Sequence, residues 1–541
     1  MKTAFNHSNA PAKRGGESLY KVLKPYSKLV FLNLIKSFKR YYLGIWLIKL
    51  PFYAIFSESK AQKWREKKAI RYTNFKNAKK QFFVFRKLIP QSKLWLDSPE
   101  FKAQYIDTNH PYPPLLNPAS IDYESISAEL AWELNLPLPP KYNMIFLSNG
   151  ASAIGATLTF LTACGVSVGG LDYTPKASYL RLYDFLSKNT SAFITLPLFA
   201  EAIVPYPEFY DDFKMRQSPN YDDSIKLIDS VTRKVPLLYV VRDPIGRMRT
   251  IINHINNLPI TPIMKRFNLT VDYENLFVKS TYFGKVAKPS FVGLDDYNEV
   301  AFLYTRLLSD SLFDALGDKV SEIHCVEFND LNADNAFALF ETLAKKFGFT
   351  MPKSTQRAIF SNRCSFCNGG AITTFPITLY VHPSDIDAKC QNLDSLRKNG
   401  GFSIIITTQT DFSLKNQGNF IDISNEIESN IIIDETKIAM LITKDEFAEL
   451  KSNTKLFNAT KKYLKGYIRA AKENVAMIRS NLIKDSDIVE YLRTHRDKRV
   501  FYKNIFDNEL RFIKAHYPHF VDKWSAYNAF NQICVESQNS L

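Results

Sequence analysis

Hydrophobic and polar positions divide the chain into regions with different patterns. Between about residues 136 and 360, short apolar runs at 144–147, 193–198, 237–241 and 323–328 alternate with segments of helical period. A parallel strand that is buried on both faces reads as such a continuous run, because neither of its faces contacts water. The pattern therefore predicts a parallel sheet built from these four segments.

Helix-compatible runs lie between and after the predicted strands. They cover 154–164, 245–256 and 335–347, and the last of them is amphipathic and stops at Gly348. Strands that alternate with helices in this order favour a doubly wound α/β fold of the kind that binds ligands at the carboxyl ends of its strands.

Two further regions flank this predicted domain. Residues 1–135 are basic and aromatic, whereas residues 361–541 begin with short strand signals and end in a long helical stretch. The strand signals are at 377–381, 402–407, 431–434 and 439–442, and the helical stretch runs from about 444 to 524. We expect a mixed, mostly helical C-terminal α+β extension, whose role the pattern does not indicate.

The N-terminal region suggests contact with a membrane surface. Residues 29–56 combine apolar bulk with interleaved Lys and Arg, and a second basic cluster follows at 60–71. An interfacial helix needs this combination, since its apolar face enters the headgroup boundary while its cations meet anionic lipid. The alternative is a helix that packs on the next domain and leaves a solvated basic face.

Composition narrows the class of protein. The chain has 541 residues, is 45% hydrophobic and 23% charged, and carries a formal net charge of +16. The hydrophobic and charged fractions are typical of a globular protein. The net charge favours a polyanionic partner, for which nucleic acid, an anionic membrane and a phosphorylated ligand are the alternatives. We find no recognition module for nucleic acid, no run long enough to cross a membrane and no signal peptide. Six scattered cysteines do not form a disulfide framework, so we expect a cytoplasmic protein. The pattern of residues 29–71 suggests that it is peripheral on the inner membrane face.

A loop of small residues follows the first predicted strand. Small residues let successive backbone N–H groups point at an anion, and the N-terminus of the next helix adds its partial positive charge. The candidate ligand-binding residues here are Asn149, Gly150, Gly155, Ala156 and Thr157. An ordinary strand-to-helix turn is the alternative interpretation, because the loop lacks the Gly-Lys-Ser/Thr of a Walker A motif.

A second motif, Arg242-Asp243-Pro244, lies at the carboxyl end of the predicted strand 237–241. A guanidinium is expensive to bury without an anion, and its planar fork suits a phosphate. Arg247 and Thr250 follow on the next predicted helix, where the Thr250 hydroxyl can face the same ligand. The alternative is that Arg242 and Asp243 form a structural cap.

Together with Phe328-Asn329-Asp330-Leu331 and the helix after it, these motifs resemble the sulfotransferase fold over residues 143–350. Members of that P-loop-type family bind the donor 3′-phosphoadenosine 5′-phosphosulfate (PAPS) and transfer its sulfuryl group to a hydroxyl. The resemblance implies that Gly155, Ala156 and Thr157 wrap the 5′-phosphosulfate. It also implies that Arg242 and Thr250 hold the 3′-phosphate. We expect no metal cofactor.

The chain departs from the family at Ala153, where members normally have Lys or Arg beside the transferring group. Lys176 and Arg247 are the cations that can replace it. A sulfuryl transfer also needs a general base for the acceptor hydroxyl, and Asp172 and Glu201 are the candidate catalytic residues. Each can equally be a surface carboxylate, and His254 is better explained as a structural histidine.

The remaining chemistry-bearing residues are less specific. The Cys364-Ser365-Phe366-Cys367 segment lacks a second pair at zinc-finger spacing, although Cys390 and His382 can complete a site if the fold brings them together. The C-terminal part also resembles a bacterial family of unknown function that is sometimes labelled sugar transferase. A glycan is therefore a candidate acceptor for the sulfuryl group.

Two other functions compete with sulfuryl transfer. One is a sugar-nucleotide-dependent glycosyltransferase, for which Asp211-Asp212 and Asp295-Asp296 are the available acidic pairs. The other is a protein that keeps the fold without catalysis and binds a membrane surface or a polyanion.

Overall fold

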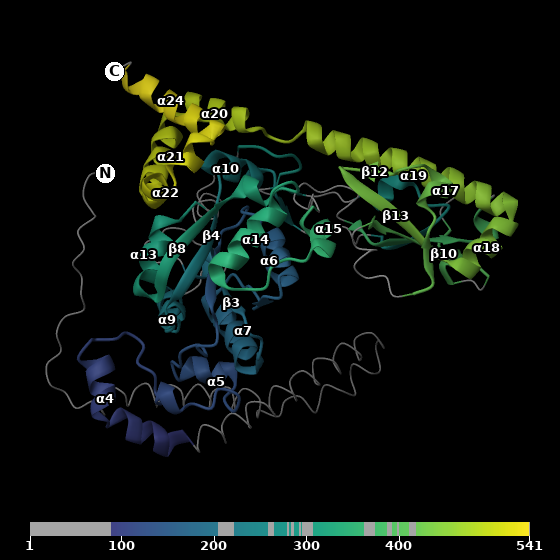
Figure 1. Cartoon of the computed structure of the whole chain (residues 1–541). Helices are drawn as coiled ribbons and strands as arrows, with labels where there is room; N and C mark the ends of the chain where they lie inside the picture. The colour runs from purple at the N-terminus through teal and green to yellow at the C-terminus, as the bar shows by residue number, and fades with distance from the viewer. Residues whose placement is uncertain are drawn as a thin grey trace, which may run out of the picture. The chain divides into compact units, whose positions relative to one another are not determined.

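The structure of the protein is a computed structural model (Figure 1). It describes residues 88–203, 221–257, 264–277, 281–282, 286–291, 294, 307–361, 374–386, 392–397, 400–409 and 418–539. The chain divides into two compact units, Met1–Pro139 and Pro140–Leu541. The predicted membrane-surface segment, residues 29–71, lies outside the described residues.

The described part of the first unit consists of short helices joined by proline-rich segments. Residues 88–96 are helical, α4 (Pro99–Phe101) continues into one π-helical turn at Lys102–Ile106, and α5 spans Ala128–Glu133. Trp95 is buried and donates its indole N–H to the carbonyl oxygen of Pro114 at 2.9 Å, which ties the helical and the proline-rich parts together.

The second unit contains a parallel sheet of five strands in the order β2-β3-β1-β4-β8. The strands are β1 (Met144–Ser148), β2 (Ser167–Val168), β3 (Ile194–Phe199), β4 (Val235–Val241) and β8 (Val320–Glu327). All of β1 and β3 and all but one residue of β4 are buried, as the continuous apolar runs predict. The structure therefore confirms a parallel α/β sheet.

Helices cover this sheet on both faces. Met144, Phe146 and Leu238 pack against α6 (Ile154–Ala163), α14 (Ala336–Phe347) and α15 (Arg357–Phe360). On the opposite face, the ring of Tyr239 contacts Phe313 of α13 (Asp310–Leu316) edge-on at 5.1 Å. The connecting helices also include α7 (Pro175–Lys188) and α9 (Tyr221–Asp229), which pack on each other.

A second, mixed sheet has the order β11-β13-β10-β9-β6. Its strands are β6 (Arg266–Asn268), β9 (Ile377–Val381), β10 (Phe402–Thr408), β11 (Phe420–Asp422) and β13 (Thr436–Thr443), with β12 (Ile432–Ile433) paired to β13. Strand β6 comes from the region before residue 360 and pairs in parallel with β9. The C-terminal sheet therefore includes a strand from the middle region of the chain.

One long helix covers this second sheet. Helix α19 (Thr454–Ser480) buries Leu456, Leu464, Tyr467 and Ile468 against the sheet residues. The shorter helices α17 (Ser424–Ile427) and α18 (Lys444–Ser452) contact β13. In the described part of the chain, no helix is long and apolar enough to cross a membrane.

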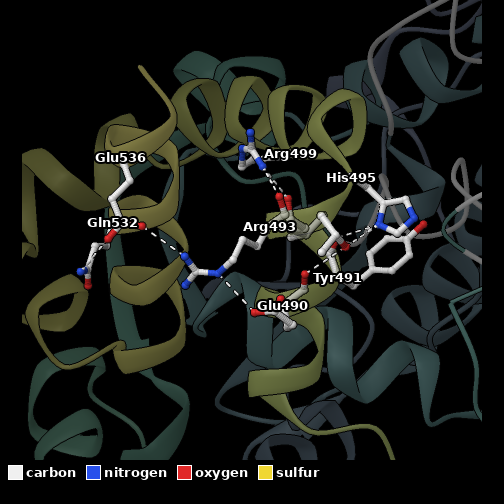
Figure 2. A network of polar contacts seen from close by, with 9 residues as sticks. Glu490, Tyr491, Arg493, His495, Arg499, Gln532 and Glu536 are labelled. Carbon is white, nitrogen blue, oxygen red and sulfur yellow. Dashed lines mark hydrogen bonds and ion pairs between the residues drawn. The ribbon is translucent and has the colours of Figure 1, made fainter. Parts of the chain in front are cut away.

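The last helices return to the parallel sheet. These are α20 (Asp485–Thr494), α21 (Arg496–Glu509), α22 (Arg511–His516), α23 (Pro518–Asp522) and α24 (Ser525–Asn539). Figure 2 shows how α20, α21 and α24 are joined. Arg493 pairs with Glu490 and Glu536, both at 3.2 Å, and the buried Arg499 donates to the carbonyl oxygens of Leu492 and Arg493. Arg499 thereby satisfies carbonyls that the end of α20 leaves without partners.

The predicted helix over 245–256 is too long. Helix α10 spans Pro244–Ile252, and residues 255–257 instead form the short strand β5, which pairs with β7 (Thr281–Tyr282). Asn253 ends the helix because its side-chain amide exchanges hydrogen bonds with the backbone of Ile483, at 2.8 and 3.0 Å. His254 consequently lies beyond the helix and is exposed.

Candidate functional site

The carboxyl ends of β1 and β4 mark the point where the chain changes direction across the sheet. After β1 the chain crosses toward β2 on one side, whereas after β4 it moves to β8 on the other side. In open α/β sheets, ligands bind outside the strand ends at such a switch point. The loop after β1 and the Arg242 segment after β4 therefore flank the position where this fold favours a ligand.

The loop after β1 has a strained backbone. Ala151 and Ala153 have φ angles of +65° and +53°, in the left-handed region that alanine seldom adopts. When residues with positive φ alternate with residues with negative φ, successive backbone N–H groups turn toward one side. This is the arrangement of an anion-binding nest. Strain of this kind clusters at ligand sites.

The start of α6 leaves hydrogen-bond donors available at this loop. Its N-cap residue is Ala153, whose side chain cannot accept from the first-turn N–H groups. Ser152 is 1% exposed, and its hydroxyl has no hydrogen-bond partner among the described residues. Backbone N–H groups, an unused hydroxyl and the positive end of a helix thus meet in one turn.

Arg242 is the cation at this turn. Its Nη1 donates to the carbonyl oxygen of Ala151 at 2.6 Å, and its Cζ lies 3.9 Å from the ring centroid of Phe328. The residue is 8% exposed, and it makes no ion pair with any carboxylate of the described residues. Burial, and then the charges of Arg249 and Arg247, lowers the pKa of Arg242 to about 10, so the group is still protonated at neutral pH.

A buried guanidinium without a carboxylate is costly, because most of its five N–H donors have lost water. Arg249 on the same segment pairs instead with Asp485, at 3.1 Å. Asp243 and Asp485 offset part of the positive charge of Arg242, Arg247 and Arg249, and a bound anion would offset the rest.

Asn149 and Arg247 lie behind the loop and are engaged inside the protein. The Asn149 side chain is fully buried and donates to the hydroxyl oxygen of Tyr239 at 2.9 Å and to the carbonyl oxygen of Leu308 at 2.5 Å. Arg247 is 4% exposed and hydrogen-bonds to Tyr239. Their buried side chains support the loop from the interior of the protein, and they do not reach a ligand on its outer side.

The other predicted ligand residues sit on the helices. Gly155 is exposed, and the space where a side chain would stand is open, so a ligand can approach its backbone. Thr157 is buried and bonds back to Ala153, while Ala156, which belongs to α6, packs against the core. The Thr250 hydroxyl donates to the carbonyl oxygen of Gly246 at 3.1 Å and keeps its acceptor lone pairs.

The two candidate bases differ in their surroundings. Asp172 pairs with Arg181 at 3.0 Å and accepts from the backbone N–H groups of Tyr173 and Thr174, which makes it part of the turn before α7. Glu201 follows β3, the neighbour of β1, and is only 6% exposed. Of the two carboxylates, Glu201 lies at the strand end next to the loop.

The two proposed replacement cations are placed less favourably than Arg242. Lys176 is in the first turn of α7, which follows β2, and β3 stands between β2 and β1. Arg247 is occupied with Tyr239. Arg242 is therefore the cation that the fold brings to the loop at Ala151.

Three contributing residues carried no functional signal in the sequence. Tyr239 sits inside an apolar run, and Phe328 belongs to a motif that we interpreted only as a strand end. Ser152 is one of several small residues in the loop. Phe328 follows strand β8, which neighbours the strand that Arg242 follows. An aromatic residue at that position would have been the signal, because aromatic rings attract guanidinium groups.

The described residues contain no group of three or more His, Cys, Asp or Glu side chains that could hold a metal ion. Cys364, Cys367 and Cys390 lie outside the described ranges, as do the acidic pairs at 211–212 and 295–296. His382 contacts the hydroxyl of Ser384 through Nδ1, at 2.8 Å.

Comparison with known proteins identifies similarity over one part of the chain. Residues 325–537 match a family model described as a protein of unknown function, DUF2972. The match begins in β8 and ends in α24, so it covers the second sheet except β6, together with the C-terminal helices, and it excludes the β1 loop and Arg242. No curated protein and no solved structure matches the chain. The chain is thus similar, between residues 325 and 537, to a family whose function is unknown.

Proposed function

We propose that the protein is a sulfotransferase-like enzyme that binds PAPS at the β1–β4 switch point. The observation that carries this proposal is the buried Arg242 guanidinium, which has no carboxylate partner among the described residues and contacts the strained loop at Ala151. In the proposed complex, the loop N–H groups and the Ser152 hydroxyl hold the 5′-phosphosulfate. Arg242 and Thr250 hold the 3′-phosphate.

In the proposed reaction, Glu201 accepts the proton of an acceptor hydroxyl, for which a glycan is the expected source. The hydroxyl oxygen then forms a bond to sulfur as the bond between sulfur and the bridging phosphate oxygen breaks. Adenosine 3′,5′-bisphosphate leaves with that oxygen. The N-terminus of α6 supplies positive charge for the transition state, in place of the family's lysine or arginine.

Isothermal titration calorimetry with adenosine 3′,5′-bisphosphate tests the binding site. Arg242→Gln should weaken binding about tenfold or more, because a hydrogen bond to a charged group contributes about 1.5–3 kcal/mol. Arg357→Gln is the matched control, since Arg357 also lies over a phenylalanine ring, at 4.1 Å from that of Phe337, but outside the site. Absence of binding by the wild type, or equal binding by Arg242→Gln, would refute the assignment.

A second experiment tests turnover. Transfer of labelled sulfate from PAPS to glycan hydroxyls should fall about 10²- to 10⁴-fold in Glu201→Gln, with unchanged affinity for the bisphosphate product. Asp172→Asn should keep a larger share of the activity, because Asp172 serves the turn before α7. If UDP-sugars are instead hydrolysed only in the presence of Mn²⁺, the glycosyltransferase alternative replaces this proposal.

We also propose that residues 29–71 attach the protein to an anionic membrane surface on the cytoplasmic side. Residues 1–87 contain 21 Lys and Arg and 3 Asp and Glu, a net of 21 − 3 = +18, so the remaining residues carry 16 − 18 = −2. The net positive charge of the chain is therefore N-terminal, which favours an anionic surface for that segment over general binding of nucleic acid by residues 88–541. Flotation with phosphatidylserine vesicles should be lost when residues 1–71 are deleted. Unchanged flotation would reject the anchor.

A further inference from the structure

A pocket of about 550 Å³ lies between α13 and α22, beside strand β8. Its lining includes Asp310, Phe313, Asp314, Ile323, Arg511 and Phe512. None of these residues takes part in the proposed nucleotide site. The volume is within the range of pockets that bind small organic molecules.

Asp310 lines this pocket and has an unused acceptor. The residue is 5% exposed, and its Oδ2 accepts from the backbone N–H of Phe512 at 2.9 Å. Its Oδ1 has no hydrogen-bond partner among the described residues. A buried carboxylate oxygen without a donor is costly, so a donor from outside would be favourable here.

The pocket carries a net negative charge. Asp314 lies one helical turn after Asp310, and Arg511 is the one cation in the lining. Its Nε is 3.5 Å from Asp310 and its Nη2 is 3.9 Å from Asp314, while its side chain is 66% exposed. Pairs of this length on an exposed side chain contribute little, so Arg511 can be displaced.

The rest of the lining is apolar. The rings of Phe313 and Phe512 meet edge-on with centroids 5.3 Å apart, and Ile323 contributes an aliphatic side chain. These walls suit a hydrocarbon stem, and the carboxylates suit a cationic head.

We propose that this pocket binds a small organic amine, with a primary ammonium group on an apolar stem. The ammonium donates to Asp310 Oδ1 and to the Asp314 carboxylate, and Arg511 moves into solvent. The stem lies along the rings of Phe313 and Phe512. Because the ammonium has three donors, it can bond to the buried Asp310 and also pair with Asp314, whose side chain is 79% exposed.

Titration of the full chain with hexylamine at pH 7.5, followed by calorimetry and by the ¹⁵N chemical shifts of residues 310–317, tests this proposal. Hexanol and hexanoate have the same stem without the cation, and we expect each to bind at least tenfold more weakly than hexylamine. Hexanol that binds as tightly as hexylamine would overturn the proposal, because the pocket would then recognise only the stem.

Variants separate the role of charge from that of folding. Asp310→Asn keeps an oxygen that accepts from the Phe512 N–H, so the fold is retained, yet hexylamine affinity should fall at least tenfold. Arg511→Ala removes the competing cation and should raise the affinity two- to fivefold. Asp318→Asn is the control, because its side chain is 94% exposed and it is not in the lining. Unchanged affinity in Asp310→Asn, or weaker binding in Arg511→Ala, would contradict the amine site.

Discussion

The carboxylate of Asp243 caps two helices that are far apart in the sequence. Its Oδ1 accepts from the backbone N–H of Ile245 at 2.9 Å, in the first turn of α10, and its Oδ2 accepts from that of Tyr527 at 3.2 Å, in the first turn of α24. Since Asp243 directly follows Arg242, this carboxylate joins the C-terminal helices to the strand end that carries the proposed anion site.

Asp243→Ala should therefore destabilise the protein by about 2 kcal/mol, because each lost helix cap costs about 1 kcal/mol. Asp243→Asn keeps one accepting oxygen and should cost about half as much. Urea denaturation measures both, with Asp318→Ala as an exposed control. Equal loss in Asp243→Asn and Asp243→Ala would show that the charge, and not the second cap, is what matters.

Asp310 should make stability depend on pH. Burial raises the pKa of Asp310 from 3.8 to about 6. The folded protein therefore holds a proton that the unfolded chain releases between about pH 4 and pH 6. This contribution is fully present below about pH 4 and is lost as the pH rises through about 6, with a size of at most about 3 kcal/mol.

Asp310→Asn removes this titration. The difference in unfolding free energy between variant and wild type should shift in favour of the variant as the pH rises from 4 to 7. Denaturation by urea across this range measures the difference curve. A curve that is flat, or that slopes the other way, would contradict the raised pKa.

Tyr517 protects the open edge of the parallel sheet. Its hydroxyl accepts from the backbone N–H of Cys325 and donates to the carbonyl oxygen of Ile323, both at 3.2 Å, on the edge strand β8. Tyr517→Phe should leave both groups without a partner and cost about 1–3 kcal/mol. Amide hydrogen exchange at Cys325 should accelerate, whereas Tyr173→Phe, at an exposed position, should leave it unchanged. Continued protection of Cys325 would show that another group covers the edge.

The central strands β1, β3 and β4 of the parallel sheet were predictable because they are buried over almost their whole length. The apolar runs at Leu237–Val241 and Ile323–Phe328 predict strands, which the structure has as β4 and β8. The amphipathic pattern that ends before Gly348 predicts the helix α14. Strand β6 was not predictable, because three residues with Arg266 and Asn268 at their ends have no period of their own. Their pairing depends on β9, more than a hundred residues later.

The proposed site was predictable only in part. Arg242 and the loop meet because they follow adjacent strands, which the order of predicted elements implies. Asn149 and Arg247 point into the protein because both bond to Tyr239 and Asn149 also bonds to the Leu308 carbonyl. No local sequence pattern places these groups together. Side-chain direction at a strand end is set by tertiary contacts, which a sequence pattern does not record.

The strain in the β1 loop predicts an unusual response to glycine. Ala151→Gly and Ala153→Gly relieve left-handed φ angles that cost alanine about 1 kcal/mol or more, which offsets the entropy that glycine loses on folding. Both variants should be neutral or up to about 1 kcal/mol more stable. Ala338→Gly, at an exposed position inside α14, should instead lose about 1 kcal/mol. Destabilisation by all three variants, measured by urea denaturation, would show that the loop is not strained.

Phe328 should position Arg242 for the ligand. The ring attracts the guanidinium that lies 3.9 Å from its centroid, and such contacts contribute about 0.5–2 kcal/mol. Phe328→Leu keeps the apolar volume but removes the ring face, so calorimetry should show affinity for adenosine 3′,5′-bisphosphate falling by about 2- to 30-fold. Phe328→Tyr retains the ring and should bind as the wild type does. Phe337→Leu makes the same change at the Arg357 pair, outside the site, and should leave the affinity unaltered. If Phe328→Leu and Phe328→Tyr weaken binding equally, the ring acts through packing alone. If neither weakens it, Arg242 is held by the Ala151 carbonyl without help from the ring.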